Sequence, residues 1–285
     1  QTEEELLEKL ETSDLTEHAG ILNELARITV RRNPGNANEY AQKAGLLATE
    51  LNQTNEIALS LKYRGIVAYF NSDMDTAMDF FEESLTFFIE SGNDLETGNI
   101  YNNIANIYND TRRYDKALEY YLKSLEIRER SSNTRLIIAS YVNIGNLFIN
   151  RGEFVKADSI YSKGLDLNRL VYPDKIDPML LKRLGDLSIL LDNHQRAENY
   201  LEEALEMAEN EQNNINLFTI NNALGNYYVR LGNFELALIH YEQALEAANI
   251  LNLKLQTATI LLNIGNTFDA TEQPRRALSY YKDSN

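Results

Sequence analysis

Apolar residues recur with the period of an α-helix along almost the whole chain. They form pairs of stretches that are joined by short polar loops. In one such pair, apolar residues recur at i, i+3, i+4 and i+7 over residues 137–150 and again over residues 154–167. The polar turn between the two stretches is Arg151-Gly152-Glu153. Because this spacing gathers apolar side chains on one face of an α-helix, each pair is predicted to form two amphipathic helices joined by a turn.

One small residue recurs at intervals of 40 residues, five times in succession without a slip. This small-residue column comprises Gly65, Ala105, Gly145, Gly185, Gly225 and Gly265. Twelve residues after each member stands an alanine: Ala77, Ala117, Ala157, Ala197, Ala237 and Ala277. Four residues further stands a ring or a leucine: Phe81, Tyr121, Tyr161, Leu201, Tyr241 and Tyr281. A strict period of this length predicts a stacked array of repeats rather than one closed globule.

Glycine in the middle of a helix costs about 1 kcal/mol relative to alanine, so the glycines of this column need a compensating gain. Close approach of the paired helix supplies one, because no Cβ separates the two backbones. The alanine column is the expected facing surface. The ring column is then expected to fill the space above and below it and to touch the next repeat.

These columns resemble the tetratricopeptide repeat, which has a small residue at its eighth position, alanine at its twentieth, an aromatic at its twenty-fourth and a small residue at its twenty-seventh. The last column is supplied by Ser84, Ser124, Gly164, Ala204 and Ala244. The family's signature tryptophan is absent, and the period is 40 residues rather than about 34. The chain is similar in this respect to the longer-helix subclass found in bacterial peptide-responsive regulators and in kinesin light chains. The resemblance implies an all-α fold, a right-handed α-α superhelix of about seven helix-turn-helix repeats.

The repeats divide the chain into a leading polar helix, residues 1–13, and a single solenoid, residues 14–285. The expected repeats are 14–53, 54–93, 94–133, 134–173, 174–213, 214–253 and a truncated 254–285. In the first of them, Ala26 takes the small-residue position and Asn33-Pro34-Gly35 marks the turn. The last repeat lacks the polar capping element that solenoids need. We therefore expect further repeats or an output domain to follow in the natural protein.

The opening of the solenoid resembles the sensor regions of bacterial signalling proteins. The resemblance is carried by Leu22-Asn23-Glu24-Leu25-Ala26, an Asn-Pro loop, and Glu39-Tyr40-Ala41-Gln42-Lys43-Ala44. Such regions occur in repeat-bearing histidine kinases, nucleotide cyclases and helix-turn-helix regulators. A start at Gln1 rather than Met is consistent with signal-peptide removal or with a trimmed chain. Together these features favour the periplasm over the cytoplasm.

The resemblance also implies a binding surface, because the first helices of tetratricopeptide repeats line the concave face. The candidate protein- or peptide-binding residues in the groove columns are Asn102, Asn103, Asn106, Asn143, Asn146, Lys182, Arg183, Asn222, Asn226, Asn263 and Asn266. An asparagine amide both donates and accepts hydrogen bonds, which suits an extended peptide backbone. The alternative is that these amides bond neighbouring helices and only fix the geometry of the repeats.

A second recognition mode of the family, the carboxylate clamp for a free peptide C-terminus, is matched only in part. Asn102, Asn106, Asn143 and Arg183 stand at clamp positions. Asn102, however, stands where the clamp has lysine, and Met179 stands in place of the second lysine. We therefore do not expect capture of a free C-terminus.

The net charge of −16 and the isoelectric point near 4.7 bound the partners further. Nucleic-acid phosphates would be repelled, so a neutral or basic protein or peptide is expected. The plainer interpretation is that the acidity only keeps a long solenoid soluble. No apolar run is long enough for a membrane span, and the absence of cysteine permits either redox compartment.

Candidate catalytic chemistry is sparse. His18, His194 and His240 fall in different repeats, and the chain contains no cysteine and no phosphate-binding, zinc-protease, esterase or EF-hand motif. The pairs Glu82-Glu83 and Glu202-Glu203 recur in one column, which indicates a solvated helix face rather than an acid–base pair. We expect no enzyme activity, no metal site and no cofactor in these residues.

The sequence therefore predicts a protein- or peptide-binding module that serves as the sensor or scaffold region of a larger bacterial signalling protein. Two alternatives remain open. The chain is a free-standing adaptor for complex assembly, or it is an oligomerisation segment that self-associates through its uncapped last repeat.

Overall fold

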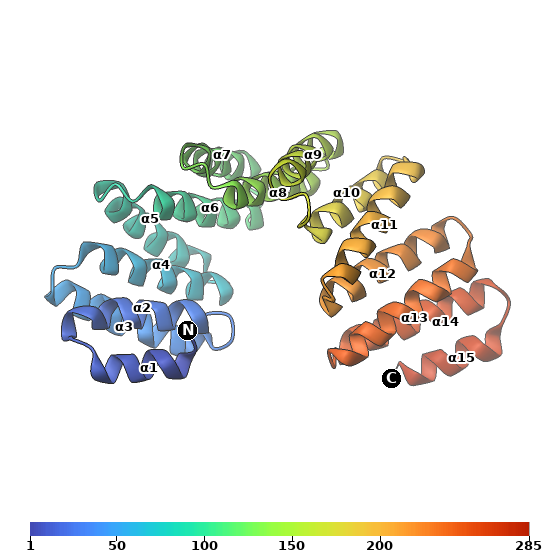
Figure 1. Ribbon diagram of the computed structural model, residues 1–285, viewed down its shortest axis with the longest axis horizontal. Coiled ribbons are helices and arrows are strands. Elements are labelled where there is room, and N and C mark those ends of the chain that lie inside the picture. The colour runs from blue at the N-terminus through green and yellow to red at the C-terminus, as the bar shows by residue number, and fades with distance from the viewer. Residues whose placement is uncertain (285) are drawn as a thin grey trace. The chain divides into compact units, whose positions relative to one another are not determined.

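The computed structural model describes residues 1–284, and every regular element in that range is an α-helix (Figure 1). The helices are α1 (Glu3–Thr12), α2 (Leu15–Thr29), α3 (Pro34–Glu50), α4 (Thr54–Phe70), α5 (Met74–Glu90), α6 (Asp94–Asp110), α7 (Tyr114–Arg130), α8 (Thr134–Asn150), α9 (Phe154–Val171), α10 (Pro178–Leu190), α11 (His194–Asn210), α12 (Asn214–Arg230), α13 (Phe234–Ile250), α14 (Lys254–Ala270) and α15 (Pro274–Asp283). The all-α helical-repeat prediction is confirmed.

The chain divides into two compact units, Gln1–Leu147 and Phe148–Asn285, with the boundary inside α8. Within each unit, the most extensive packing joins the two helices of a hairpin, for example α6 with α7 and α12 with α13. The leading helix α1 lies on α2, where Leu6 joins a buried cluster with Leu22 and Leu25. The single continuous solenoid over residues 14–285 stays a prediction.

The small-residue column makes room for the ring column of the same repeat. A Cβ on Gly65 would lie 2.6 Å from Cε1 of Phe81, and one on Gly225 would lie 2.4 Å from Cε1 of Tyr241. The alanine column also faces the small residue at Gly185, where the Ala197 carbonyl oxygen would lie 3.5 Å from a Cβ. The ring or leucine of the second helix lies directly against the glycine and takes the space that a Cβ would need, while Ala77 and its equivalents are buried in the same hairpins.

Turns of one kind end most helices and keep the repeats uniform. After α6, Arg112 adopts a left-handed φ of 58°. Its N–H bonds the Asn109 carbonyl at 3.0 Å, and the N–H of Arg113 bonds the Tyr108 carbonyl at 2.7 Å. This is the Schellman arrangement, which satisfies the last carbonyls of a helix. The equivalent left-handed position is a glycine at Gly92, Gly152 and Gly232. The same turn therefore follows helices in both units.

Candidate functional site

The first helices α2, α4 and α6 line a cavity of about 440 Å³ in the N-terminal unit. We call it the N-terminal groove. Its lining residues are Arg27, Val30, Arg31, Lys62, Tyr63, Ile66, Tyr69, Phe70, Phe81, Asn99, Asn102, Asn103, Asn106 and Arg128. The groove therefore combines an apolar and aromatic wall with a row of amides and four cationic side chains.

Three predicted binding residues, Asn102, Asn103 and Asn106, lie in this groove. Nδ2 of Asn143 on α8 donates to Oδ1 of Asn102 at 2.8 Å, which links the first helices of two successive repeats. Asn106 accepts a hydrogen bond of 2.6 Å from the Tyr121 hydroxyl in its own repeat. Asn146 is half-buried on α8.

A second hollow of about 430 Å³ lies in the C-terminal unit, and we call it the C-terminal groove. Its lining residues are Lys182, Asp186, Ile189, Leu190, Phe218, Thr219, Asn222, Ala223, Asn226, Tyr227 and Arg230. Three predicted residues, Lys182, Asn222 and Asn226, lie here. Lys182 forms an ion pair of 2.5 Å with Asp186 one turn along α10, where Arg183 is half-buried.

The remaining predicted residues of the C-terminal unit repeat the bonding seen in the N-terminal unit. Nδ2 of Asn263 donates to Oδ1 of Asn222 at 3.3 Å, which again joins successive first helices. Asn226 accepts from the Tyr241 hydroxyl at 2.7 Å. Asn266 accepts from the Tyr281 hydroxyl at 2.9 Å. The asparagine columns thus contribute to the architecture of the repeats.

These bonds also orient the amides. Because the tyrosine hydroxyl is bonded to Oδ1, the Nδ2 group of Asn106 and of Asn226 keeps two N–H donors for another acceptor. A backbone carbonyl of an extended segment is such an acceptor. An amide whose orientation is already fixed loses less conformational freedom on binding.

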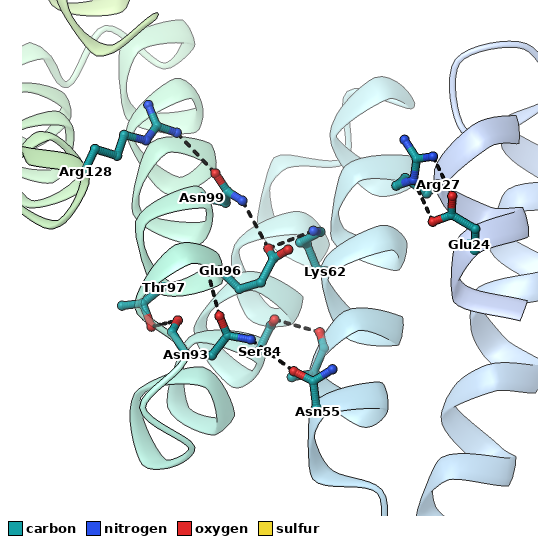
Figure 2. A network of polar contacts seen from close by, with 11 residues as sticks. Glu24, Arg27, Asn55, Lys62, Ser84, Asn93, Glu96, Thr97, Asn99 and Arg128 are labelled. Carbon is teal, nitrogen blue, oxygen red and sulfur yellow. Dashed lines mark hydrogen bonds and ion pairs between the residues drawn. The ribbon is translucent and has the colours of Figure 1, made fainter. Parts of the chain in front are cut away.

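A polar network crosses the N-terminal groove and includes residues that the sequence did not single out (Figure 2). Nζ of Lys62 lies 2.8 Å from Oε2 of Glu96, and the same oxygen accepts from Nδ2 of Asn99 at 3.2 Å. Oδ1 of Asn99 accepts from Nη2 of Arg128 at 3.3 Å. The row runs from α4 through α6 to α7, so it connects two successive hairpins.

Arg128 is the unusual member of this row. It is only 6% exposed, and burial lowers the pKa of its guanidinium. The sequence carried a signal for it, because the equivalent position of the other second helices is never charged. That column contains Ala48, Phe88, Asn168, Ala208 and Ala248. A search restricted to first-helix columns does not find it, because Arg128 lies on a second helix.

Burial also sets the ionisation of the groove's aromatic wall. It raises the pKa of the Tyr63 hydroxyl well above its ordinary value, with the Glu96 carboxylate adding to the effect. Tyr63 is therefore a neutral hydrogen-bonding group at physiological pH. Over residues 1–284, no three histidine, aspartate or glutamate side chains gather in a way that could hold a metal ion. In the same range, no helix is both long and apolar enough to cross a bilayer.

Comparison with protein families agrees with the repeat geometry. The tetratricopeptide repeat profile matches residues 53–130, 96–170 and 216–284, and a second profile of the same description matches residues 183–211. The chain belongs to the tetratricopeptide repeat family. The family match accounts for the small, alanine and ring columns. No curated protein matches the sequence.

Solved structures of other tetratricopeptide repeat proteins have the same fold. A signal transduction ATPase with numerous domains from Pyrococcus horikoshii, which carries a tetratricopeptide repeat sensor, is 17% identical, with a TM-score of 0.70 over 96% of this chain and 46% of that one. The apo form of RapI is 18% identical, with a TM-score of 0.68 over 93% of this chain and 96% of that one. A Rap protein complexed with competence and sporulation factor is 14% identical, with a TM-score of 0.66 over 98% and 77%. At these identities the likeness concerns the fold.

Proposed function

We propose that this tetratricopeptide repeat protein is a protein- or peptide-binding module, the sensor or scaffold region of a larger bacterial signalling protein. It binds an extended segment along the first helices of each unit. One observation carries the proposal: Asn106 and Asn226 have their Oδ1 atoms held by tyrosines while their amide N–H groups stay available beside a groove. The assignment gives these residues no catalytic role.

The structural neighbours support the same reading. One is an ATPase whose repeats are described as a sensor, and another is a Rap protein solved with competence and sporulation factor bound. A sensor must present a surface that distinguishes one partner from others, and a ladder of oriented donors reads the backbone of any extended segment. Selectivity must then come from side chains around the ladder.

The experiment compares three forms of the protein as bait in a lysate, read by mass spectrometry. The first is the parent, and the second carries Asn→Asp at 106, 146, 226 and 266. Aspartate keeps an acceptor for each tyrosine but removes the N–H donors. The third form carries Tyr→Phe at 121, 241 and 281, which breaks the internal bonds and leaves the amides in place.

We expect a partner that the parent captures, the phenylalanine form captures more weakly because its amides are no longer oriented, and the aspartate form loses. All three forms must first show the same helical content by circular dichroism at the assay temperature. A partner that all three capture equally would place recognition on another surface and leave the asparagines as architecture alone.

A further inference from the structure

A buried cation in the N-terminal groove has no counter-charge. Nη1 of Arg128 donates to the Leu136 carbonyl at 3.3 Å and to Oγ of Ser140 at 2.8 Å. Nη2 donates to Oδ1 of Asn99 at 3.3 Å, and the buried Nε has no hydrogen-bond partner. Every one of these acceptors is neutral. A guanidinium has five N–H donors and keeps its charge in proteins, so its charge here is uncompensated by contact.

Glu96, the acid of this polar network, already has a cationic partner. Glu96 forms an ion pair with Lys62 and is linked to Arg128 only through hydrogen bonds of the Asn99 amide (Figure 2). At the exposed wall, the two oxygens of Glu24 bind Arg27 at 2.5 and 2.7 Å. Among the described lining residues of the N-terminal groove there are four cations and no carboxylate.

Hydrogen bonding alone does not explain this cation, because its three neutral acceptors hold the guanidinium in place without neutralising its charge. Burying a charge without a charged partner costs stability, and an apolar side chain of similar volume is often better. The other repeats use alanine, phenylalanine or asparagine at the same position, as Ala48, Phe88 and Ala208 show. A guanidinium kept at this place is explained by an anion that binds beside it.

We propose that the N-terminal groove binds the side-chain carboxylate of an acidic residue in an extended peptide segment. The carboxylate lies at Nη2 of Arg128, beside Lys62, and a neighbouring apolar side chain of the peptide packs on Tyr63, Ile66 and Phe70. Phe70 is 46% exposed and therefore open to such a contact. The inference rests on the proposed function and specifies its ligand.

The local charge is opposite to that of the whole chain. The net charge of −16 favours neutral or basic partners at long range. At contact distance, however, the side chains that line the groove determine which charge is bound, because electrostatic attraction is strongest where water is excluded. The N-terminal groove therefore selects an acidic residue within a partner.

The test uses three sets of fluorescent peptides of about nine residues, long enough at roughly 3.3 Å per residue to cross three helices spaced roughly 8–10 Å apart. The first set has one glutamate beside leucine or tyrosine in an otherwise neutral sequence, with both ends blocked. The second has glutamine in place of glutamate. The third also has glutamine but a free C-terminal carboxylate. Binding to the whole protein is measured by fluorescence polarisation at two salt concentrations.

Two variants accompany the parent. Arg128→Met removes the buried charge and keeps an apolar stem, and Arg130→Met removes an exposed charge from the same helix outside both grooves. We expect the glutamate set to bind more tightly than the glutamine set, with an affinity that falls as salt rises. Arg128→Met should lose about tenfold in affinity for the glutamate set alone, the value of one charge-assisted hydrogen bond. Arg130→Met should bind as the parent does.

Folding is checked by thermal melts. Arg128→Met should melt close to the parent's temperature, since the removal of an uncompensated buried charge offsets the loss of its three neutral hydrogen bonds. Equal binding of the glutamate and glutamine sets, unchanged by Arg128→Met, would overturn the acidic selectivity and leave peptide binding intact. Preference for the third set would assign the site to a free C-terminus instead. No binding by any set would overturn both this inference and the proposed function.

Discussion

The hydroxyl of Tyr121 on α7 donates a hydrogen bond of 2.6 Å to Oδ1 of Asn106 on α6. The same pair recurs fifteen residues apart as Asn226 with Tyr241 and as Asn266 with Tyr281. Where the ring lacks a hydroxyl, the partner position is not asparagine: Ile66 accompanies Phe81, and Asp186 accompanies Leu201. The two columns therefore vary together, as a pair that exchanges one hydrogen bond should.

Breaking this pair should cost a measurable amount of stability. We expect Tyr121→Phe to lower the free energy of unfolding by about 1 kcal/mol, because the hydroxyl is buried and its bond is intramolecular. Asn106→Ala should cost a similar amount. In the double variant the two losses should not add, with a coupling of about 0.5–1.5 kcal/mol in a double-mutant cycle measured by urea denaturation. Full additivity would mean that the bond contributes nothing to the fold.

The contact between the small residue and the ring leads to a second prediction. A glycine-to-alanine substitution should change the free energy of unfolding in opposite directions at two positions. Gly225→Ala puts a Cβ 2.4 Å from the Tyr241 ring, so the helices must separate, and we expect a loss of about 1–3 kcal/mol. Gly20→Ala in α2 meets only the Glu56 carboxylate at 3.7 Å, an ordinary contact. There the helix propensity of alanine should add about 1 kcal/mol. Urea denaturation of both variants measures these changes. A Gly225→Ala variant more stable than the parent would contradict the packing described.

The turns make a third prediction about backbone strain. Arg112 holds a left-handed φ of 58°, which side chains with a Cβ rarely adopt. Arg112→Gly should raise the free energy of unfolding by about 0.5–1 kcal/mol, because glycine adopts this conformation without strain. The reverse change, Gly92→Ala at a φ of 68°, should cost about 1 kcal/mol even though nothing within 4 Å would touch the new Cβ. Both variants are measured by thermal or urea unfolding. If they changed the free energy of unfolding in the same direction, strain would be ruled out as the cause.

Much of the fold was readable from the spacing alone. Apolar positions at helical intervals predict the hairpins, although α8 begins at Thr134, one turn before its apolar pattern does at residue 137. The first turn of such a helix carries few core contacts, so hydrophobic spacing does not mark it. The pairing of Asn106 with Tyr121 was not predicted, although the two columns vary together in the sequence.

The groove was harder to predict. Periodicity assigns each residue to a face of its own helix, but not to the helix that it reaches across the stack. Arg128 belongs to a second helix and yet contacts Asn99 of the preceding first helix and Ser140 of the next. Such contacts depend on the angle between hairpins, which small changes in packing determine. The break in the apolar column at Arg128 was the available signal.

His240 offers a pH-dependent test of the C-terminal unit. Its ring stacks on Tyr228 with centroids 5.5 Å apart and planes 10° apart, and Nδ1 donates to Oδ1 of Asn221 at 2.9 Å. Burial lowers the pKa of the imidazole from its ordinary value of 6.5. The neighbouring Tyr228 hydroxyl, whose burial raises its pKa to about 12, does not titrate near this range.

The sign of the effect follows from linkage. Below pH 6.5 the unfolded chain binds a proton at His240 more readily than the folded chain does, so protonation favours unfolding. Stability from the neutral ring is fully present above pH 6.5 and declines as pH falls from 6.5 through the lowered folded pKa. His240→Tyr, which places in this column the residue found at Tyr120 and Tyr200, should remove that decline. Urea denaturation of parent and variant between about pH 8 and pH 5 measures the difference. A difference that stays constant across the range would show that the ring titrates in the folded protein as it does in the unfolded chain.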